Sequence, residues 1–222
     1  MIHIYTKLAK TNFAIAILLI LLTGCSSYYP QIVDVPLIKE KGDLRVDAGI
    51  TYVPSIHGTI SYGLTDIIAI QAYSNIDVLG RYHLQGAVGL FKGFENKTVT
   101  EIYGGYGYGN SIMGQLFDVN VDNHLAFIQY NLGKTDQGKA HIDYGLGIKT
   151  GYLYSRIIDS DLVTTVQDDG LILEPTIFFR IGWEKIKFDI KANYLWTNNK
   201  AIDEYSTIYY PFNLSMGVNF NF

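Results

Sequence analysis

The sequence predicts an all-β protein, an antiparallel up-and-down transmembrane β-barrel of about ten strands. Three observations support this fold class. Large apolar residues alternate with polar ones through most of the chain after residue 43. The chain contains 18 Tyr and 11 Phe, and aromatic residues favour strands. Short stretches containing Gly, Asn and Asp separate the alternating segments, which is typical of hairpin turns.

The alternation divides the chain into segments, most of them close to the roughly 9–11 residues that a tilted strand needs to cross a bilayer. The predicted strands are residues 44–53, 56–63, 67–75, 80–92, 98–108, 123–133, 139–155, 171–183, 185–196 and 208–222. Every second connection is short, and three of the others are longer, at about 109–122, 156–170 and 197–207. Short turns at one end and long loops at the other are the plan of an outer-membrane barrel.

Each predicted strand has one apolar and one polar face. In residues 185–196, the side chains of Ile186, Phe188 and Ile190 share one face, and those of Lys187, Asp189 and Lys191 share the other. A soluble barrel encloses its apolar face, whereas a membrane barrel turns it towards lipid. Aromatic residues near segment ends favour the membrane arrangement, in which they form belts at the two interfaces. These residues are Tyr52, Tyr62, Tyr73, Tyr108, Tyr152, Tyr154, Trp183, Tyr194 and Trp196.

The polar faces carry eleven charged residues that the membrane arrangement would enclose in the lumen. They are Arg45, Asp47, Arg81, Glu101, Asp143, Lys149, Glu174, Arg180, Lys187, Asp189 and Lys191. An unpaired buried charge costs several kcal/mol, so we expect these residues to form a salt-bridge network. Barrels of about 8 strands are filled by side chains, and those of about 16 strands enclose an aqueous channel. About ten strands therefore predict a mostly plugged lumen, or at best a narrow pore.

The amino terminus predicts export. Residues 1–24 contain two lysines, no acid and an apolar run over residues 13–22, as in a signal peptide. Cys25 follows in "LLTGC" and is the single cysteine of the chain. This stretch resembles a bacterial lipobox, and the resemblance implies that lipoprotein-processing machinery makes Cys25 the lipidated first residue. Residues 25–42 would then be an extended lipidated tether before a β-barrel domain at residues 43–222. The alternative is an ordinary signal peptide that leaves Cys25 as a free thiol.

An even strand count would return both ends of the barrel domain to the periplasmic side, and a lipid on Cys25 would lie there too. The final stretch, "PFNLSMGVNFNF", alternates strictly and finishes on an aromatic residue. It resembles the carboxy-terminal signal of bacterial outer-membrane β-barrels. The resemblance implies that Phe220 and Phe222 are read by the barrel-assembly machinery and that the partner of the folded chain is outer-membrane lipid.

The stretches "PLIKEKGDL", "YGLTD" and "YGGYGYG" extend the resemblance to small lipobox-bearing outer-membrane barrels of Gram-negative bacteria. This resemblance does not indicate any particular activity. The formal net charge is −4, and it becomes −6 (15 basic and 21 acidic residues) once Lys7 and Lys10 leave with residues 1–24. That balance argues against nucleic acid as a partner.

The sequence contains no pattern that predicts catalysis. It has no Gly-x-Ser-x-Gly elbow, and His57, His83, His124 and His141 are scattered singly. We therefore expect no enzyme activity, metal or cofactor, and a structural, adhesive or accessory role whose loop-binding partner the sequence does not identify. Two alternatives stay open. One is a narrow channel or transporter for small solutes, and the other is a periplasmic lipid-anchored soluble β-barrel that binds an apolar ligand.

Overall fold

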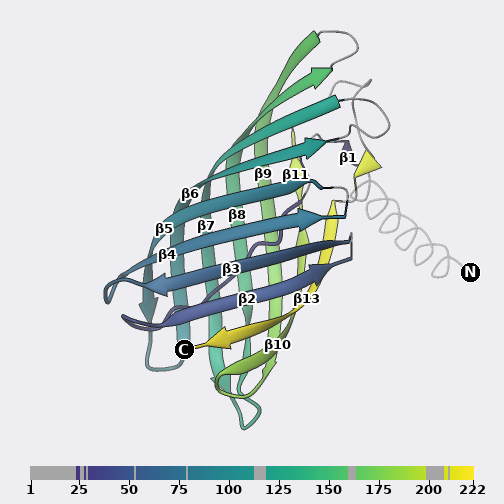
Figure 1. Ribbon diagram of the computed structural model, residues 1–222. Helices are drawn as coiled ribbons and strands as arrows, with labels where there is room; N and C mark the ends of the chain where they lie inside the picture. Colours follow the sequence, from purple (N-terminus) through teal and green to yellow (C-terminus); the bar gives the residue numbers. More distant parts are fainter. Residues whose placement is uncertain are drawn as a thin grey trace, which may run out of the picture.

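The structure, a computed structural model, is a closed antiparallel barrel of ten long strands, which confirms the predicted fold class (Figure 1). It describes residues 24–25, 28, 30–52, 54–78, 80–112, 119–159, 164–198, 208–209 and 211–222. The barrel closes because β10 pairs with both β9 and β13, and β13 pairs with β2. No helix among these residues is long and apolar enough to cross a membrane.

The ten long strands follow one another around the barrel in chain order. They are β2 (Leu44–Thr51), β3 (Ser55–Gly63), β4 (Ile68–Asp77), β5 (Tyr82–Gly93), β6 (Thr98–Ile112), β7 (Val119–Gln137), β8 (Ile142–Asp159), β9 (Thr164–Gly182), β10 (Ile186–Tyr194) and β13 (Phe212–Asn221). Three further strands have two residues each: β1 (Gly24–Cys25), β11 (Trp196–Thr197) and β12 (Ile208–Tyr209). Strand β11 prolongs the pairing along β9, and β1 pairs with β12.

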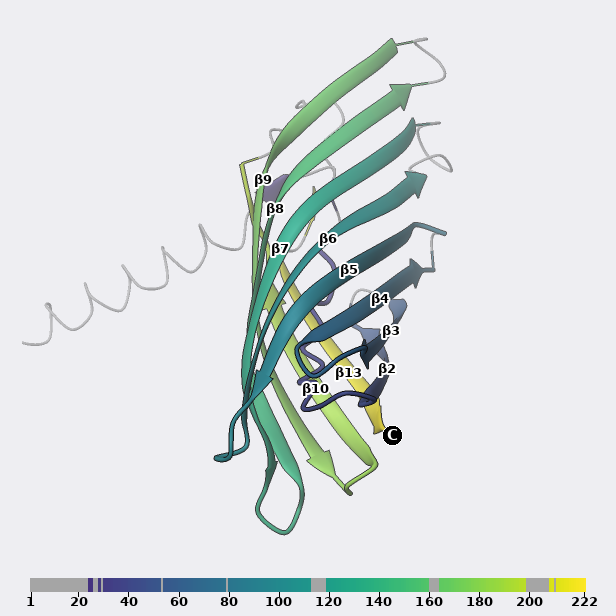
Figure 2. The ribbon, with the colours of Figure 1, turned by 90° about the vertical axis from the view of Figure 1, so that its left-hand side faces the viewer.

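The two ends of the barrel differ. At the turn end lie the connections 64–67, 94–97, 138–141 and 183–185 together with the carboxy terminus, where Phe222 N donates to Leu44 O at 3.0 Å. The loop end is the opposite end, where β2 is followed by β3, β4 by β5, β6 by β7, β8 by β9 and β10 by β13. Strands β7, β8 and β9, of 19, 18 and 19 residues, are longer than their predicted segments and form a wall that rises at the loop end (Figure 2).

The apolar faces point outward. In β10, Ile186, Phe188 and Ile190 are 41%, 57% and 48% exposed, whereas Lys187 and Lys191 are fully buried in the lumen. This is the reverse of a soluble protein, whose charged side chains lie in water. Exposed aromatic residues follow both rims of the apolar surface: Tyr52, Tyr82, Tyr106, Tyr152 and Trp196 towards the loop end, and Tyr62, Phe94, Tyr144, Trp183 and Phe222 towards the turn end.

One aromatic residue expected in these belts lies elsewhere. Tyr73 points into the lumen, is 6% exposed, and donates a hydrogen bond from its hydroxyl to Gln31 Oε1 at 3.2 Å. Alternation explains this position, because Gln71, Tyr73 and Asn75 are every second residue of β4 and all three point inward. Position near a segment end therefore does not by itself make an aromatic residue part of the belt.

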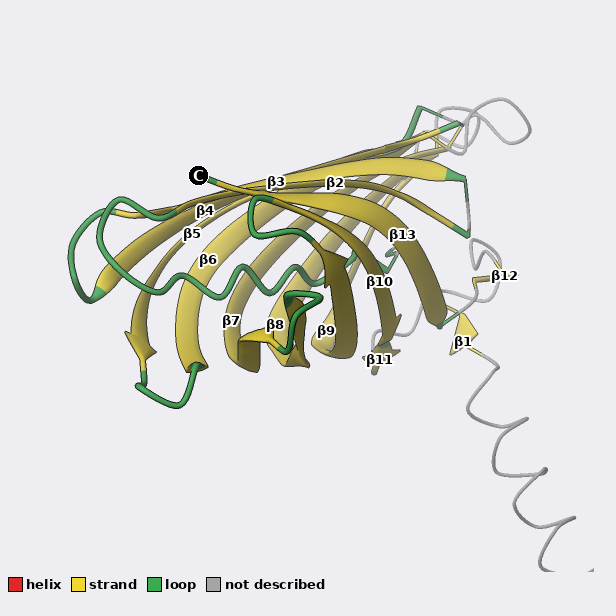
Figure 3. Cartoon of the chain, turned by 90° about the horizontal axis from the view of Figure 1, so that it is seen from below, coloured by secondary structure: helices red, strands yellow, loops and turns green. Residues whose placement is uncertain are grey.

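The interior of the barrel contains part of its own chain. Residues 30–38, which we call the lumenal segment, run without regular secondary structure between the strand walls, and every one of them is buried (Figures 1 and 3). The sequence predicted an extended tether here. The segment is extended and precedes the first long strand, but its place inside the barrel was not foreseen.

Candidate functional site

The lumenal segment and the inward side chains around it form the candidate site. The segment is apolar except at Gln31 and Asp34, and Ile32, Val33, Val35, Leu37 and Ile38 are each at most 1% exposed. A fully buried extended chain has backbone groups that need hydrogen-bond partners. The strands supply these partners from their inward polar side chains.

Side chains of six residues hold the backbone of the lumenal segment, and one of them is Glu174, whose Oε1 accepts from Gln31 N at 3.2 Å. Asn213 Nδ2 donates to Pro30 O at 3.2 Å, Asn193 Nδ2 to Gln31 O at 2.8 Å, and Gln129 Nε2 to Asp34 O at 2.8 Å. Arg180 Nη1 donates to Val35 O at 2.8 Å, and Ile38 N donates to Glu101 Oε1 at 2.7 Å. The contacts come from five different strands, so the segment is fixed across the whole interior.

Glycines on the inner wall make room for the segment. A Cβ at Gly147 would lie 2.8 Å from Val35 Cγ2, and one at Gly133 would lie 2.9 Å from Leu37 Cδ1. A Cβ at Gly63 would lie 3.1 Å from Ile38 Cγ2 of the segment and 2.5 Å from Glu40 O just after it. Glycine is therefore required at these positions by the close approach of the segment.

Substituting Gly147 by alanine is expected to destabilise the barrel by about 1–3 kcal/mol, because the added methyl overpacks the wall against Val35. Urea unfolding in detergent micelles would measure the loss. Gly104→Ala is the matched control, since a Cβ at Gly104 meets nothing within 4 Å. Equal stabilities for the two variants would contradict the close packing of the segment.

The central ion cluster consists of Asp34, Asp47, Arg180, Asp189 and Lys191. Lys191 Nζ lies 3.0 Å from Asp34 Oδ1 and 2.8 Å from Asp189 Oδ2, and it also contacts Asp47. Arg180 Nη2 lies 3.1 Å from Asp34 Oδ1, and Arg180 Nε lies 3.7 Å from Asp189 Oδ2. Three carboxylates thus share two cations, and Asp34 joins the lumenal segment to β9 and β10.

A second cluster lies at the turn end. Lys187 Nζ contacts Asp143 Oδ1 at 2.7 Å and Asp136 Oδ1 at 2.8 Å, and Lys39 Nζ contacts Asp136 Oδ2 at 2.6 Å. Asp136 lies in the hairpin beyond Leu132, the last outward apolar residue of β7. Partial burial raises the pKa of its carboxyl, but the hydrogen bonds from Lys187 and Lys39 outweigh that effect and hold the pKa below its usual range.

Lys149 and Glu174 pair with each other, whereas Glu101, which we expected in the salt-bridge network, forms no ion pair with the residues that the structure describes. Lys149 Nζ lies 3.5 Å from Glu174 Oε2 and donates to Gln85 Oε1 at 3.1 Å. Glu101 is held by neutral donors, with Asn131 Nδ2 at 2.8 Å as well as the backbone of Ile38.

Two further predicted members, Arg45 and Arg81, also lie at the barrel ends, away from the central ion cluster. Arg45 Nε bonds to Asp43 Oδ1 at 2.9 Å near the carboxy terminus. Arg81 contacts Asp77 in the turn between β4 and β5 at the loop end. The sequence predicted that both arginines face the lumen. Alternation along a strand gives the face of a side chain, but it does not give the height along the barrel axis at which that side chain lies.

Sequence reasoning missed three members of the charge clusters: Lys39, Asp34 and Asp136. Asp34 was the most detectable, because a single acid in the otherwise apolar run "IVDVPLI" implies a buried partner.

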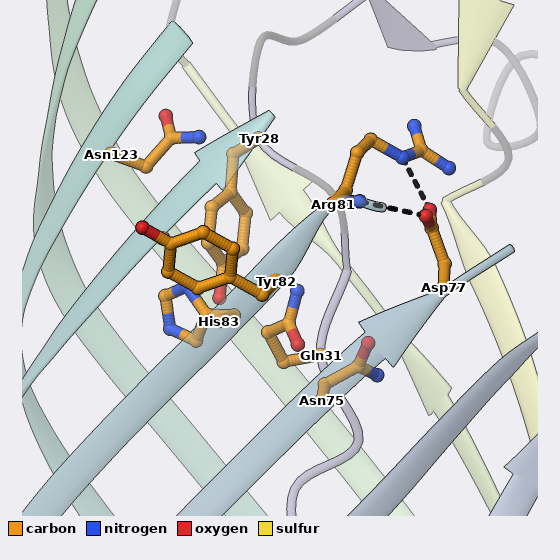
Figure 4. Close-up of a pocket in the computed structure, with 9 residues that line it drawn as sticks. Tyr28, Gln31, Asn75, Asp77, Arg81, Tyr82, His83 and Asn123 are labelled. Carbon is orange, nitrogen blue, oxygen red and sulfur yellow. Dashed lines mark hydrogen bonds and ion pairs between the residues drawn. The ribbon is translucent and has the colours of Figure 1, made fainter. Parts of the chain in front are cut away.

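A small cavity lies in the lumen near the loop end. Its volume is about 10 Å³, and it lies between the start of the lumenal segment and strands β4 to β7, lined by Tyr28, Gln31, Asn75, His83 and Asn123 among others (Figure 4). A volume of that size holds about one water molecule. Tyr28 packs edge-on against His83, with ring centroids 5.7 Å apart.

One buried constellation has the residue types of a nucleophilic triad. His57 Nε2 lies 2.6 Å from Ser215 Oγ, and His57 Nδ1 lies 3.9 Å from Asp47 Oδ1. The second distance exceeds a hydrogen bond, and Asp47 is engaged by Lys191 in the central ion cluster. We interpret the group as buried packing of polar residues, and the absence of enzyme activity stays a prediction.

The predicted terminal signals lie at opposite ends of the barrel. Cys25 is in β1, paired with Ile208 of β12 in the connection at the loop end. Phe220 and Phe222 lie at the turn end, with ring centroids 6.4 Å apart. The expectation that Cys25 would accompany the carboxy terminus is therefore wrong, because the lumenal segment crosses the barrel before β2 begins.

No protein-family model matches the sequence, and no curated protein does. Among solved structures, the barrel is similar to one described as "KdgM porin in complex with disordered oligogalacturonate". The TM-score is 0.42 and the sequence identity 9%, over 81% of this chain and 99% of that one. The oligogalacturonate named in that description is the ligand of that porin.

Proposed function

We propose that this protein is an outer-membrane β-barrel lipoprotein whose lumen is closed by its own lumenal segment, with a structural, adhesive or accessory role. The single observation that carries the proposal is the complete burial of residues 30–38 among inward polar side chains. The lumen is therefore occupied by protein, and the surface left for contacts with other molecules is the loop end.

Insertion in a membrane is supported by the distribution of polarity. A belt of exposed Ile, Leu, Val and Phe side chains surrounds a closed sheet, and aromatic residues lie along its two rims. Closure leaves no unpaired strand edge, which a barrel needs in lipid. An aqueous surround would instead leave this apolar belt in contact with water, an arrangement that soluble proteins avoid.

Closure of the lumen is supported by its charges and volumes. Ten strands enclose somewhat more space than side chains fill alone, and the lumenal segment occupies the surplus. The central ion cluster ties that segment to two strands through Asp34. A role as a general porin would require this packed interior to open.

Conductance in planar bilayers tests the proposal against the narrow-channel alternative. We expect the intact protein to give no current steps above the bare bilayer. A variant lacking residues 30–38 is expected to conduct, because removing the segment empties the lumen. Migration that changes on heating would verify that both proteins are folded barrels. Steady current through the intact protein would favour the channel, and silence of both folded proteins would show that the segment does not close the lumen.

Extraction separates the membrane barrel from a soluble barrel. The Cys25→Ala protein is expected to stay in the membrane fraction until detergent is added, because the apolar belt holds it there without any lipid on Cys25. Recovery of folded Cys25→Ala protein without detergent would support the soluble alternative instead.

A further inference from the structure

The lumenal segment has a direction along the barrel axis. Tyr28 packs against His83 close to the loop end, and Asp34 meets Arg180 and Lys191 farther inside. Lys39 reaches Asp136 in the hairpin at the turn end. The chain therefore enters its own barrel at the loop end and leaves it at the turn end, where β2 begins (Figure 3).

A second observation places the residues before the segment. Strand β1 pairs with β12 in antiparallel register, Gly24 with Tyr209 and Cys25 with Ile208. Strand β12 belongs to the connection between β11 and β13, which is at the loop end. The start of the segment and the strand before it thus lie at the same end, opposite to Phe222.

We propose that the amino terminus of the mature chain is displayed on the outer surface of the membrane, and that its lipid anchor inserts in the outer leaflet. The inference rests on the proposed function and on the usual orientation of outer-membrane barrels, whose short turns face the periplasm and whose long loops face outward. An anchor on the periplasmic side would require the lumenal segment to leave the lumen, and this would break the contacts of Asp34 with two cations.

The anchor would then lie in the outer leaflet, and the barrel would span both leaflets. Acyl chains hold a protein to a membrane in proportion to their buried length, and durable anchoring needs more than one device. Here the barrel itself supplies the second device. A lipid beside the loop end would tether the amino-terminal end of the lumenal segment and oppose its withdrawal towards the periplasm.

Labelling of intact Gram-negative cells tests the inference. Single cysteines replace Ser27, just before the segment, or Lys41, an exposed residue in the turn after it. The label is a polyethylene-glycol maleimide too large to pass porins, and labelling is seen as a gel shift. We expect Ser27→Cys to be labelled on intact cells and Lys41→Cys to be labelled after the outer membrane is permeabilised.

Val78→Cys is the reference for the loop end, since Val78 is 75% exposed in the turn between β4 and β5. The parent chain gives the background from Cys25. If Val78→Cys is labelled on intact cells and Ser27→Cys is not, the inference is overturned while the membrane barrel stands. Heat-modifiable migration and detergent extraction report on the barrel separately, so failure of the proposed function is recognised by those measurements.

Discussion

Substituting Lys191 by methionine is expected to destabilise the folded barrel by about 3–5 kcal/mol, because it leaves buried carboxylates without their partner. Lys191 is fully buried and contacts Asp34, Asp47 and Asp189, so its removal leaves Arg180 alone to balance three acids. Methionine keeps most of the side-chain volume, and the loss is therefore one of charge. Urea unfolding in detergent micelles, followed by the fluorescence of Trp183 and Trp196, would measure it.

Two controls separate this effect from a general loss of charge. Lys185→Met removes a lysine from an exposed turn and is expected to change the stability by less than about 0.5 kcal/mol. Lys191→Arg keeps the positive charge and should recover part of the loss. A wild-type stability for Lys191→Met would contradict the central ion cluster.

Substituting Ile190 by arginine is expected to cost about 2–4 kcal/mol, the cost of a cation on the lipid face near the middle of a bilayer. Ile190 lies at the centre of β10 and is 48% exposed on the outer face. The next residue, Lys191, points into the lumen. Unfolding in phospholipid vesicles is the appropriate measurement, since the penalty comes from the hydrocarbon.

Ile190→Leu is the matched control and should leave the stability within about 1.5 kcal/mol of wild type. If Ile190→Arg inserts and unfolds as the parent does, then Ile190 does not face lipid. Together with Lys191→Met, the pair tests both faces of one strand with adjacent residues. A soluble barrel would tolerate arginine at an exposed position, so the outcome also discriminates between the two classes of barrel.

The sequence anticipated the strands because alternation is a local property. In β10, each inward residue is separated from the next by one outward residue, and lipid or lumen on either side selects the residue types. The segments predicted from this alternation were shorter than the observed strands β7, β8 and β9. Their outer parts continue beyond the apolar belt into residues such as Asp122 and Asp169, where the alternation is weaker.

The sequence did not reveal the content of the lumen. Residues 30–38 have no period of their own, and their burial depends on walls that come from the rest of the chain. Gly133 and Gly147 leave space for the segment, but the sequence alone does not indicate this. Glycine in a strand can equally mark a bulge or a bend. The role of these two glycines is visible once Leu37 and Val35 are placed against them.

The amino-acid sequence by itself indicated about ten strands and which side chains of a strand share a face, because alternation depends on neighbours one or two residues apart. It left open which of the two faces the barrel encloses, and the structure decided this. The tertiary structure decided which charges meet, where the lumenal segment runs and at which end Cys25 lies. Asp34 and Arg180 are 146 residues apart, and Asp47 and Lys191 are 144 apart. Such contacts exist only after β10 and β13 close the barrel, when strand stagger sets the height at which each inward side chain finds its partners.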